Sequence, residues 1–307
     1  MTARSRIAFV AVAVATLAAA SATQAQQTAS KPDSSGYVTA NGVDYWFEIH
    51  GKGEPLLLLH GGLFSTGMFG PTLTKLAEHR RVIGVDQHGH GPTALGARRT
   101  ISLVDIGRDL AVVVQKLGLR QVDVMGYSFG GGAGLQLAFQ HPALVRRLVV
   151  VSAPYAQDGF FPEMLPQQAA VGAAMADAMK DTPMYRNYAA LAPRPQDFPR
   201  LLDAMGAYMR QPYDWSAEVK RLTMPVMLVY GDSDMIRPEH IVSFYQLLGG
   251  GLRDAGWMRE HMSRHRLAIL PDLTHYEIGA APILAPTVLP FLDGQTGPKD
   301  PAAQPPK

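Results

Sequence analysis

VDVMGYSFG at residues 122–130 decides how this 307-residue chain folds. The apolar run 122–127 is typical of a buried strand, and the glycine-rich stretch that starts near Phe129 is typical of a helix. Gly126-Tyr127-Ser128-Phe129-Gly130 joins them as G-x-S-x-G, the pattern of a tight elbow that presents a serine hydroxyl at the end of a strand. Both outer glycines are needed because side chains two positions either side of the serine would clash. Ser128 is therefore the candidate nucleophile.

A serine hydroxyl becomes a good nucleophile only when a base takes its proton and an acid orients that base. His275 follows a short apolar run near the end of the chain, and we predict that it is the base. Asp234 follows the preceding apolar run, so Ser128, Asp234 and His275 occur in the chain order expected for such an elbow. We prefer Asp234 as the acid because it lies further from its strand end than Asp232, which stays the alternative. Asp272 is expected to shape a turn instead.

Acyl transfer also needs N–H donors for the oxyanion of its transition state. One donor should be the amide of Phe129, directly after the nucleophile. The other should come from His60-Gly61-Gly62-Leu63, which follows an apolar run. We choose Gly62 because a backbone without a side chain can approach the substrate closely. His60 is expected to brace this loop by hydrogen bonds, without a catalytic role.

Short apolar runs alternate with helical stretches along most of the chain, which predicts an α/β fold with a mostly parallel sheet flanked by helices. Asn41-Gly42 predicts a hairpin between two short strands within 37–50. Ser102 and Asp105 have capping-box spacing at the start of a helix over 102–117, and Pro238 opens another over 238–248. The runs that predict buried strands are Leu56–His60, Arg81–Asp86, Val122–Tyr127, Leu148–Ser152, Val226–Gly231 and Leu267–Leu270.

Residues 155–215 interrupt this alternation with a helical pattern broken by prolines, which predicts a helical cap inserted between two strands of a core formed by 37–154 and 216–293. Methionines and aromatic residues are frequent in the cap. Some should form its own core, and others should line an apolar substrate pocket, since such side chains make adaptable surfaces. They are Met164, Met175, Met179, Met184, Met205, Met209, Phe160, Phe161, Tyr185, Tyr188, Phe198 and Tyr208.

The two ends of the chain are not expected to belong to the core. Residues 1–25 have a basic start, an apolar run of fourteen residues and small residues up to Ala25, the layout of a secretory signal peptide. The run is shorter than the roughly 20 residues that a membrane anchor needs, so cleavage after Ala22 or Ala25 is expected. The protein would then be secreted or periplasmic, with no membrane association. Residues 26–36 and the proline-rich 294–307 are expected to be disordered, and 249–265 to form a loop of unknown role.

Composition excludes several function classes. The chain has no cysteine, so disulfides, thiol catalysis and cysteine metal sites are excluded. Its net charge of +2 comes from Arg4 and Arg6; the remainder has 26 basic and 26 acidic residues and no basic tract, which argues against nucleic-acid binding.

His88-Gly89-His90 lacks the further ligands of a metallo-hydrolase, so no metal or cofactor is predicted. The other histidines (His50, His79, His141, His240, His261 and His265) are expected to be surface or capping residues.

These motifs together resemble the α/β-hydrolase superfamily, in particular its cap-bearing esterase, lactonase and perhydrolase-like branch. The resemblance covers residues 37–293 and rests on HGG at 60–62, DQHGHGPT at 86–93, GYSFG at 126–130, GDSD at 231–234 and His275. The second motif departs from the usual D-x-R-G-x-G-x-S, because His88 replaces the arginine and Thr93 the serine. This departure leaves open how the loop is held in place, but it does not affect the expected reaction. Ser128 at the elbow argues against dehalogenases and epoxide hydrolases, which have an aspartate there.

The resemblance implies a serine hydrolase that cleaves a small-molecule carboxylic ester or lactone with an apolar moiety, without a cofactor. Ser128, Asp234 and His275 would form the triad, and Gly62 and Phe129 the oxyanion hole. The same residues also serve cofactor-free perhydrolysis and C–C or amide hydrolysis, so the motifs leave these alternatives open. A non-catalytic binding protein of the same fold is a further alternative. The oligomeric state is not encoded in any pattern of the sequence.

Overall fold

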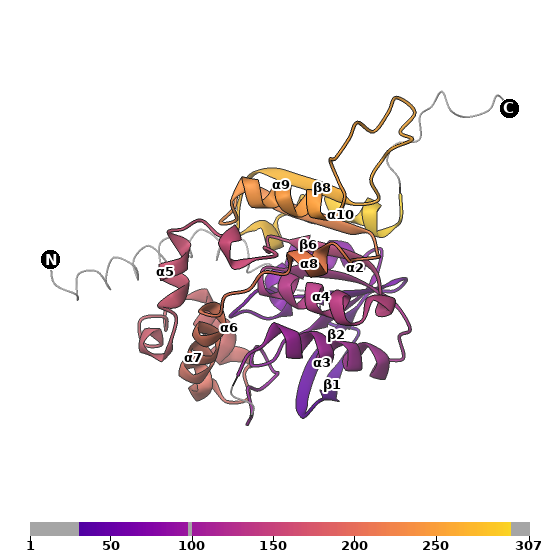
Figure 1. The fold of residues 1–307 in the computed structure, drawn as a ribbon. Coiled ribbons are helices and arrows are strands. Elements are labelled where there is room, and N and C mark those ends of the chain that lie inside the picture. The colour runs from indigo at the N-terminus through magenta and orange to yellow at the C-terminus, as the bar shows by residue number, and fades with distance from the viewer. Residues whose placement is uncertain (1–30, 98–99, 296–307) are drawn as a thin grey trace.

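The computed structural model describes residues 31–97 and 100–295, and its centre is a sheet of eight strands (Figure 1). The strand order is β1-β2-β4-β3-β5-β6-β7-β8. The first three strands in this order pair antiparallel, and all strands from β4 onward pair in parallel. The strands are β1 Ser34–Ala40, β2 Val43–His50, β3 Pro55–Leu59, β4 Arg81–Val85, β5 Val122–Tyr127, β6 Val145–Val151, β7 Val226–Ser233 and β8 Arg266–Thr274.

The predicted alternation of strands and helices is confirmed. Every predicted apolar run forms a strand, and the predicted Ser102 cap is present, since its side chain accepts a hydrogen bond from the Asp105 amide. The helices are α2 Pro71–Ala77, α3 Leu103–Lys116, α4 Phe129–Gln140, α5 Met164–Ala169, α6 Pro183–Leu191, α7 Phe198–Met209, α8 Ser216–Val219, α9 Pro238–Leu247 and α10 Leu284–Leu292. None of the helices in the described part of the chain has the length and apolar character needed to cross a membrane.

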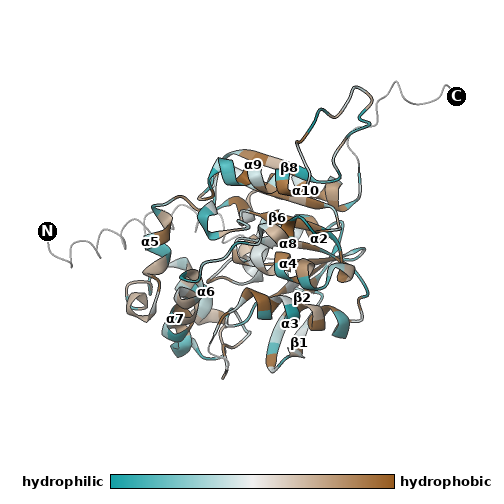
Figure 2. Cartoon of the chain, viewed as in Figure 1, coloured by the Kyte–Doolittle hydropathy of each residue, from teal (hydrophilic) through white to brown (hydrophobic). Residues whose placement is uncertain are grey.

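Successive strand residues point to opposite faces of the sheet, and helices bury both faces. In β3, Leu57 and Leu59 belong to the hydrophobic cluster that includes α3, α4 and α9. Leu56 and Leu58 belong to the second cluster, together with α2 and α10. In Figure 2, α3 and α9 carry both hydrophobic and hydrophilic residues, as helices that cover a sheet on one side do. This two-sided burial explains why the strands appear in the sequence as continuous apolar runs.

A buried ion-pair network lies at the amino end of β5, away from Ser128. Arg80 is 2% exposed, and its guanidinium donates to the fully buried carboxylate of Asp123 at 2.7 Å. Arg146 donates to both oxygens of the same carboxylate at 2.9 Å. The network joins β5 to the start of β4 and to β6, so it holds three strands in register at this end of the sheet.

The segment 155–215 leaves the sheet after β6 and returns before β7, and it contains α5, α6 and α7 (Figure 1). The two ends of this segment pair with each other: the Gln157 amide donates to the Tyr213 carbonyl at 3.0 Å, and the Trp215 amide to the Tyr155 carbonyl at 2.9 Å. The segment therefore starts and finishes at one place on the core. Figure 1 also shows the loop between α9 and β8 projecting from the body, with the Trp257 side chain 97% exposed.

Two expectations, one about disorder and one about the position of histidines, were wrong. Ser34–Gly36, expected to be disordered, belong to β1, because this polar stretch pairs along an edge with β2 and the Asp33 amide donates to the Ile49 carbonyl. His50, His240 and His265, expected to be surface or capping residues, are buried. His240 and His265 each accept a backbone amide hydrogen bond, so the polar ring is satisfied inside the protein. Residues 1–30 and 296–307, with the signal peptide and most of the expected tail, lie outside the described residues.

Candidate active site

Ser128 sits on the strained turn that the sequence predicts. Its backbone angles are φ 53° and ψ −118°, a left-handed conformation for a non-glycine residue, between the end of β5 and the start of α4. A Cβ on Gly126 would lie 2.1 Å from the Gly130 carbonyl oxygen, and one on Gly130 would lie 2.2 Å from the Leu59 carbonyl oxygen. Both glycines are thus required sterically, as expected.

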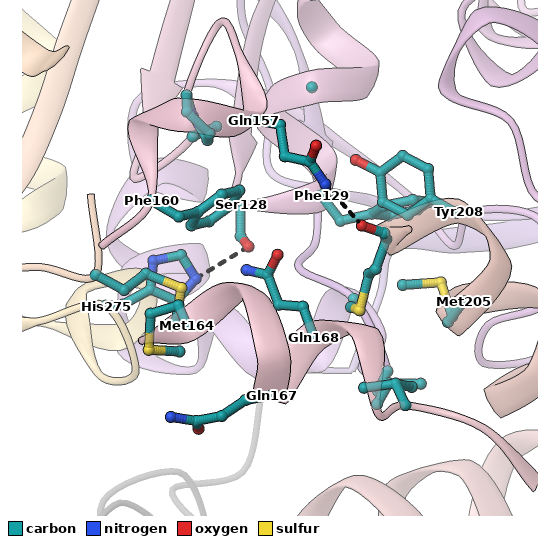
Figure 3. A pocket seen from close by; sticks show the side chains of 18 of the residues that line it. Ser128, Phe129, Gln157, Phe160, Met164, Gln167, Gln168, Met205, Tyr208 and His275 are labelled. Atoms are coloured by element: carbon teal, nitrogen blue, oxygen red, sulfur yellow. Dashed lines mark hydrogen bonds between the residues drawn. The ribbon is translucent and has the colours of Figure 1, made fainter. Parts of the chain in front are cut away.

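The structure brings Ser128, His275 and Asp234 into one hydrogen-bonded chain. His275 Nε2 lies 3.0 Å from Ser128 Oγ, and His275 Nδ1 lies 3.1 Å from Asp234 Oδ1 (Figure 3 shows the first of these bonds). Because a carboxylate can only accept, Nδ1 must carry the ring proton, which leaves Nε2 free to accept the proton of the serine hydroxyl.

Irregular pairing between β7 and β8 explains why Asp234, not Asp232, faces the histidine. The register shifts after Gly231, so that Ser233 pairs with Thr274 and the following residues, Asp234 and His275, lie side by side. Asp232 lies within the shift, and its carboxylate accepts the Asp272 amide at 3.1 Å. The alternative acid is therefore engaged elsewhere, and Asp272, with φ 58°, is in a turn-like conformation.

Asp234 has further donors that sequence reasoning missed. The buried Ser152 hydroxyl donates to Asp234 Oδ2, and the Ile236 amide donates to Oδ1 at 3.3 Å. Burial opposes ionisation of this carboxyl, but the hydrogen bonds from His275 and Ser152 outweigh it, and the pKa of Asp234 lies below its usual range. Ser152 directly follows β6, as Ser128 follows β5, and this shared position was the only signal in the sequence.

Two other missed residues position His275. The buried Tyr127 hydroxyl donates to the His275 backbone carbonyl at 2.5 Å, and its ring lies 5.2 Å from the imidazole. The Glu277 carboxylate accepts the Thr274 amide at 2.6 Å and also the Thr274 hydroxyl. The residues on both sides of His275 are therefore fixed, which limits how far the imidazole can move from Ser128.

Gly62 and Phe129 lie together at the point where the strand order of the sheet reverses. Strand β3 pairs with β4 on one side and β5 on the other, so the loops that follow β3 and β5 diverge and leave a crevice at their carboxyl ends. A Cβ on Gly62 would lie 3.7 Å from Phe129 Cβ, which places the two backbones side by side. Phe129 is the first residue of α4, so its N–H has no acceptor within the helix and remains available as a donor.

The loop that carries Gly62 is braced from behind. The Gln87 amide donates to His60 Nε2 at 2.9 Å, and His60 Nδ1 lies 2.7 Å from the Gly61 carbonyl oxygen. Burial lowers the pKa of His60 to about 4, so the ring is neutral. His60 therefore has the bracing contacts expected of it.

The residues that depart from the usual loop motif make hydrogen bonds of their own. Thr93 donates to the Asp86 carbonyl at 2.6 Å and accepts the Trp46 amide at 2.8 Å. His88 Nε2 lies 3.0 Å from the Leu95 carbonyl oxygen, and His90 Nδ1 lies 3.0 Å from the His88 carbonyl oxygen. The loop is therefore held by hydrogen bonds from Thr93, His88 and His90.

A cavity of about 300 Å³ opens above Ser128 (Figure 3). Its walls combine core residues, including Gly62, Ser128 and His275, with side chains from the segment 155–215. Eight of the twelve methionines and aromatic residues singled out in that segment line the cavity. Among the others, Phe198 packs against the rings of Tyr185 and Tyr188 at 5.1 and 5.2 Å. Some of these side chains therefore face the cavity, and others pack inside the segment.

The chain matches the family model described as the alpha/beta hydrolase fold over residues 54–250. It therefore belongs to the α/β-hydrolase fold family, which confirms the fold class and the resemblance to that superfamily.

Similar proteins include hydrolases with different substrates. A putative carbamate hydrolase, RutD of Azorhizobium caulinodans, is 34% identical over 126 residues, which is 40% of this chain and 46% of the relative. The chain thus matches less than half of that relative's length. Two solved structures share the fold: a thermophilic esterase from Thermogutta terrifontis (17% identity, TM-score 0.65, 86% of this chain and all of the other), and an enol-lactonase from Burkholderia xenovorans (20%, 0.62, 84% and all).

Proposed function

We propose that this α/β hydrolase is a serine hydrolase that cleaves a carboxylic ester or lactone with an apolar moiety through an acyl-enzyme. The observation that carries the proposal is the chain of hydrogen bonds from Ser128 Oγ to His275 Nε2 and from His275 Nδ1 to Asp234, at 3.0 and 3.1 Å, on the floor of the cavity. Nucleophile, base and orienting acid are each within hydrogen-bond reach of the next group.

The residues divide the reaction between them. Ser128 Oγ attacks the carbonyl carbon while His275 Nε2 takes its proton, and the imidazolium then gives that proton to the leaving alcohol. Asp234 holds the ring in the tautomer with Nδ1 protonated and stabilises its positive charge. The amides of Gly62 and Phe129 would donate to the oxyanion of each tetrahedral intermediate. Water, activated by the same histidine, then attacks the acyl-enzyme and releases the acid.

The walls of the cavity support an apolar substrate. Seven methionines line it: six come from residues 155–215, and the seventh is Met235. Aromatic rings form much of the remaining wall. Such side chains adapt to apolar groups of different shape. We therefore assign 155–215 the role of a cap that binds the acyl or alcohol part. The names of the similar proteins, an esterase, an enol-lactonase and a putative carbamate hydrolase, suggest which carbonyl groups to compare first.

The test is hydrolysis of p-nitrophenyl esters from acetate to laurate by the wild type and by Ser128→Ala, followed by a lactone and a carbamate panel. We expect ester turnover in the wild type and a loss of at least about a thousandfold in the variant, as removal of a triad nucleophile causes. Turnover that survives the substitution, or no turnover of any ester, would contradict the proposal. Faster turnover of a matched carbamate than of the ester would reassign the substrate while keeping the mechanism.

We further propose that the protein is exported, so that it acts in the periplasm or outside the cell. The proposal is supported by the basic start, apolar run and small residues of 1–25, which lie outside the described residues. Amino-terminal sequencing of the protein recovered from the periplasmic fraction of an expressing bacterium should give a start at Thr23 or Gln26, after Ala22 or Ala25. A start at Met1 in the cytoplasm would contradict export.

A further inference from the structure

The part of the cavity beyond Ser128 is polar in only a few places, and none of these is charged. Among the described residues that line it, there is no lysine, arginine, aspartate or glutamate. Three glutamine amides, from Gln157, Gln167 and Gln168, are the main hydrogen-bonding groups contributed by the segment 155–215. A substrate that extends into this region therefore meets neutral donors and acceptors within an apolar wall.

Two of the three glutamines are already engaged within the protein. The side-chain amide of Gln157 donates to the Met209 backbone carbonyl at 3.1 Å, and the side-chain amide of Gln167 donates to the Glu163 backbone carbonyl at 3.2 Å. Figure 3 shows that Gln167 points away from Ser128. The NH2 group of each side chain is therefore already engaged, and it is not free to donate to a ligand without breaking that hydrogen bond.

Gln168 differs from both. It lies in α5, its side chain is half-buried, and in Figure 3 its amide points toward Ser128 across the cavity. Its side-chain nitrogen and oxygen make no hydrogen bond with any other described residue. When a substrate displaces water from this part of the cavity, the amide loses hydrogen bonds to that water, and a hydrogen-bonding oxygen of the substrate would replace them.

We propose that Gln168 binds an uncharged oxygen of the substrate, such as an ether, ketone or hydroxyl oxygen, located a few bonds from the scissile carbonyl. This inference rests on the proposed function and narrows its substrate class to neutral esters or lactones that carry a second hydrogen-bonding oxygen. Substrates with a carboxylate in the same place are rejected, because the described walls offer no cation to pair with it.

A matched pair of esters tests the oxygen. p-Nitrophenyl 3-methoxypropanoate and p-nitrophenyl pentanoate have the same chain length and differ by an ether oxygen in place of one methylene. Each kcat/KM is divided by the rate of hydrolysis of that ester in hydroxide, which removes the difference in intrinsic reactivity. The wild type should prefer the ether by about three- to tenfold, the effect of one neutral hydrogen bond.

Gln168→Met should abolish this preference, since methionine has a similar length and already lines the cavity. Gln167→Met is the matched control and should keep the wild-type ratio, because its amide is bound by Glu163. The ratio of two substrates on one enzyme does not depend on how much of a variant is folded. An unchanged ratio in Gln168→Met, or no preference in the wild type, would overturn the inference.

A second pair tests the charge. p-Nitrophenyl methyl adipate and p-nitrophenyl hydrogen adipate differ at neutral pH only by a methyl group that removes a negative charge. We expect the neutral ester to be favoured at least about a hundredfold, because the carboxylate would be desolvated without a partner. Equal rates would overturn the neutral-substrate assignment. Pentanoate turnover that is lost in Ser128→Ala separates these results from a failure of the proposed function itself.

Discussion

Asp234→Asn tests whether the buried carboxylate next to His275 stabilises the reaction by its charge. The substitution keeps the size of the side chain, removes the negative charge and replaces one carboxylate oxygen with an NH2 group. Asp232→Asn is the matched control two positions earlier, where the carboxylate accepts the Asp272 amide and does not contact the histidine. Both variants change the net charge of the protein equally, so a difference between them reports the local geometry.

The size of the effect follows from the site. Asp234 is nearly fully buried and lies 3.1 Å from His275 Nδ1. At an effective dielectric constant of about 20, two unit charges about 4 Å apart attract by about 4 kcal/mol, and the imidazolium exists only after proton transfer. If the new amide nitrogen faces Ser152, the ring keeps its tautomer and kcat should fall by about a thousandfold. If the nitrogen faces His275, the ring takes the wrong tautomer and the loss reaches about ten thousandfold.

The assay is kcat and kcat/KM for p-nitrophenyl butanoate, with the folded fraction of each variant determined by near-UV circular dichroism. We predict a loss of a thousandfold or more for Asp234→Asn and a change below about threefold for Asp232→Asn. Comparable losses in both variants, or a loss below tenfold in Asp234→Asn, would refute the assignment of Asp234 as the orienting acid.

Three other substitutions probe the scaffold. Gly126→Ala places a Cβ 2.1 Å from the Gly130 carbonyl oxygen and should lower the free energy of unfolding by about 1–3 kcal/mol or more in urea titrations; an unchanged midpoint would contradict the steric argument. Asp123→Ala leaves the buried Arg80 guanidinium without its main partner and should cost about 3–5 kcal/mol, while the folded fraction keeps its activity. Burial lowers the pKa of His90 to about 3, so the unfolded chain binds a proton below pH 6.5 that the folded protein does not, and stability falls as pH decreases. His90→Phe should reduce this slope between pH 6.5 and 4 by up to about 1.4 kcal/mol per pH unit, and an unchanged slope would contradict the burial argument.

The elbow and its partners could be predicted from the sequence because local rules determine them. A G-x-S-x-G pattern between an apolar run and a glycine-rich helix leaves few other conformations, and the clash distances at Gly126 and Gly130 show why. The order Ser128, Asp234, His275 follows from where the strands end. The choice of Asp234 over Asp232 agreed with the geometry, but its physical cause, the register shift after Gly231, could not be seen in the sequence.

The residues that support the site could not be predicted because they depend on tertiary contacts. Ser152 reaches Asp234 only because β6 lies between β5 and β7, and Tyr127 reaches the His275 carbonyl from a strand distant in sequence. The methionine-rich composition of 155–215 indicated an apolar cavity but not which side chains face it. Ser34–Gly36 were misjudged because a polar edge strand is determined by its pairing partner, which the polarity of the segment does not show.

The central claim, that His275 activates Ser128 as a nucleophile, is tested most directly by covalent labelling with a fluorophosphonate. The reagent reacts with an activated serine and leaves a stable adduct that mass spectrometry of the peptides can place. We predict one adduct per chain, on Ser128, at a rate that falls at least about a thousandfold in His275→Ala, since removing any one triad member removes most of the activation. An adduct on another serine, or labelling of Ser128 at the same rate without His275, would contradict the account.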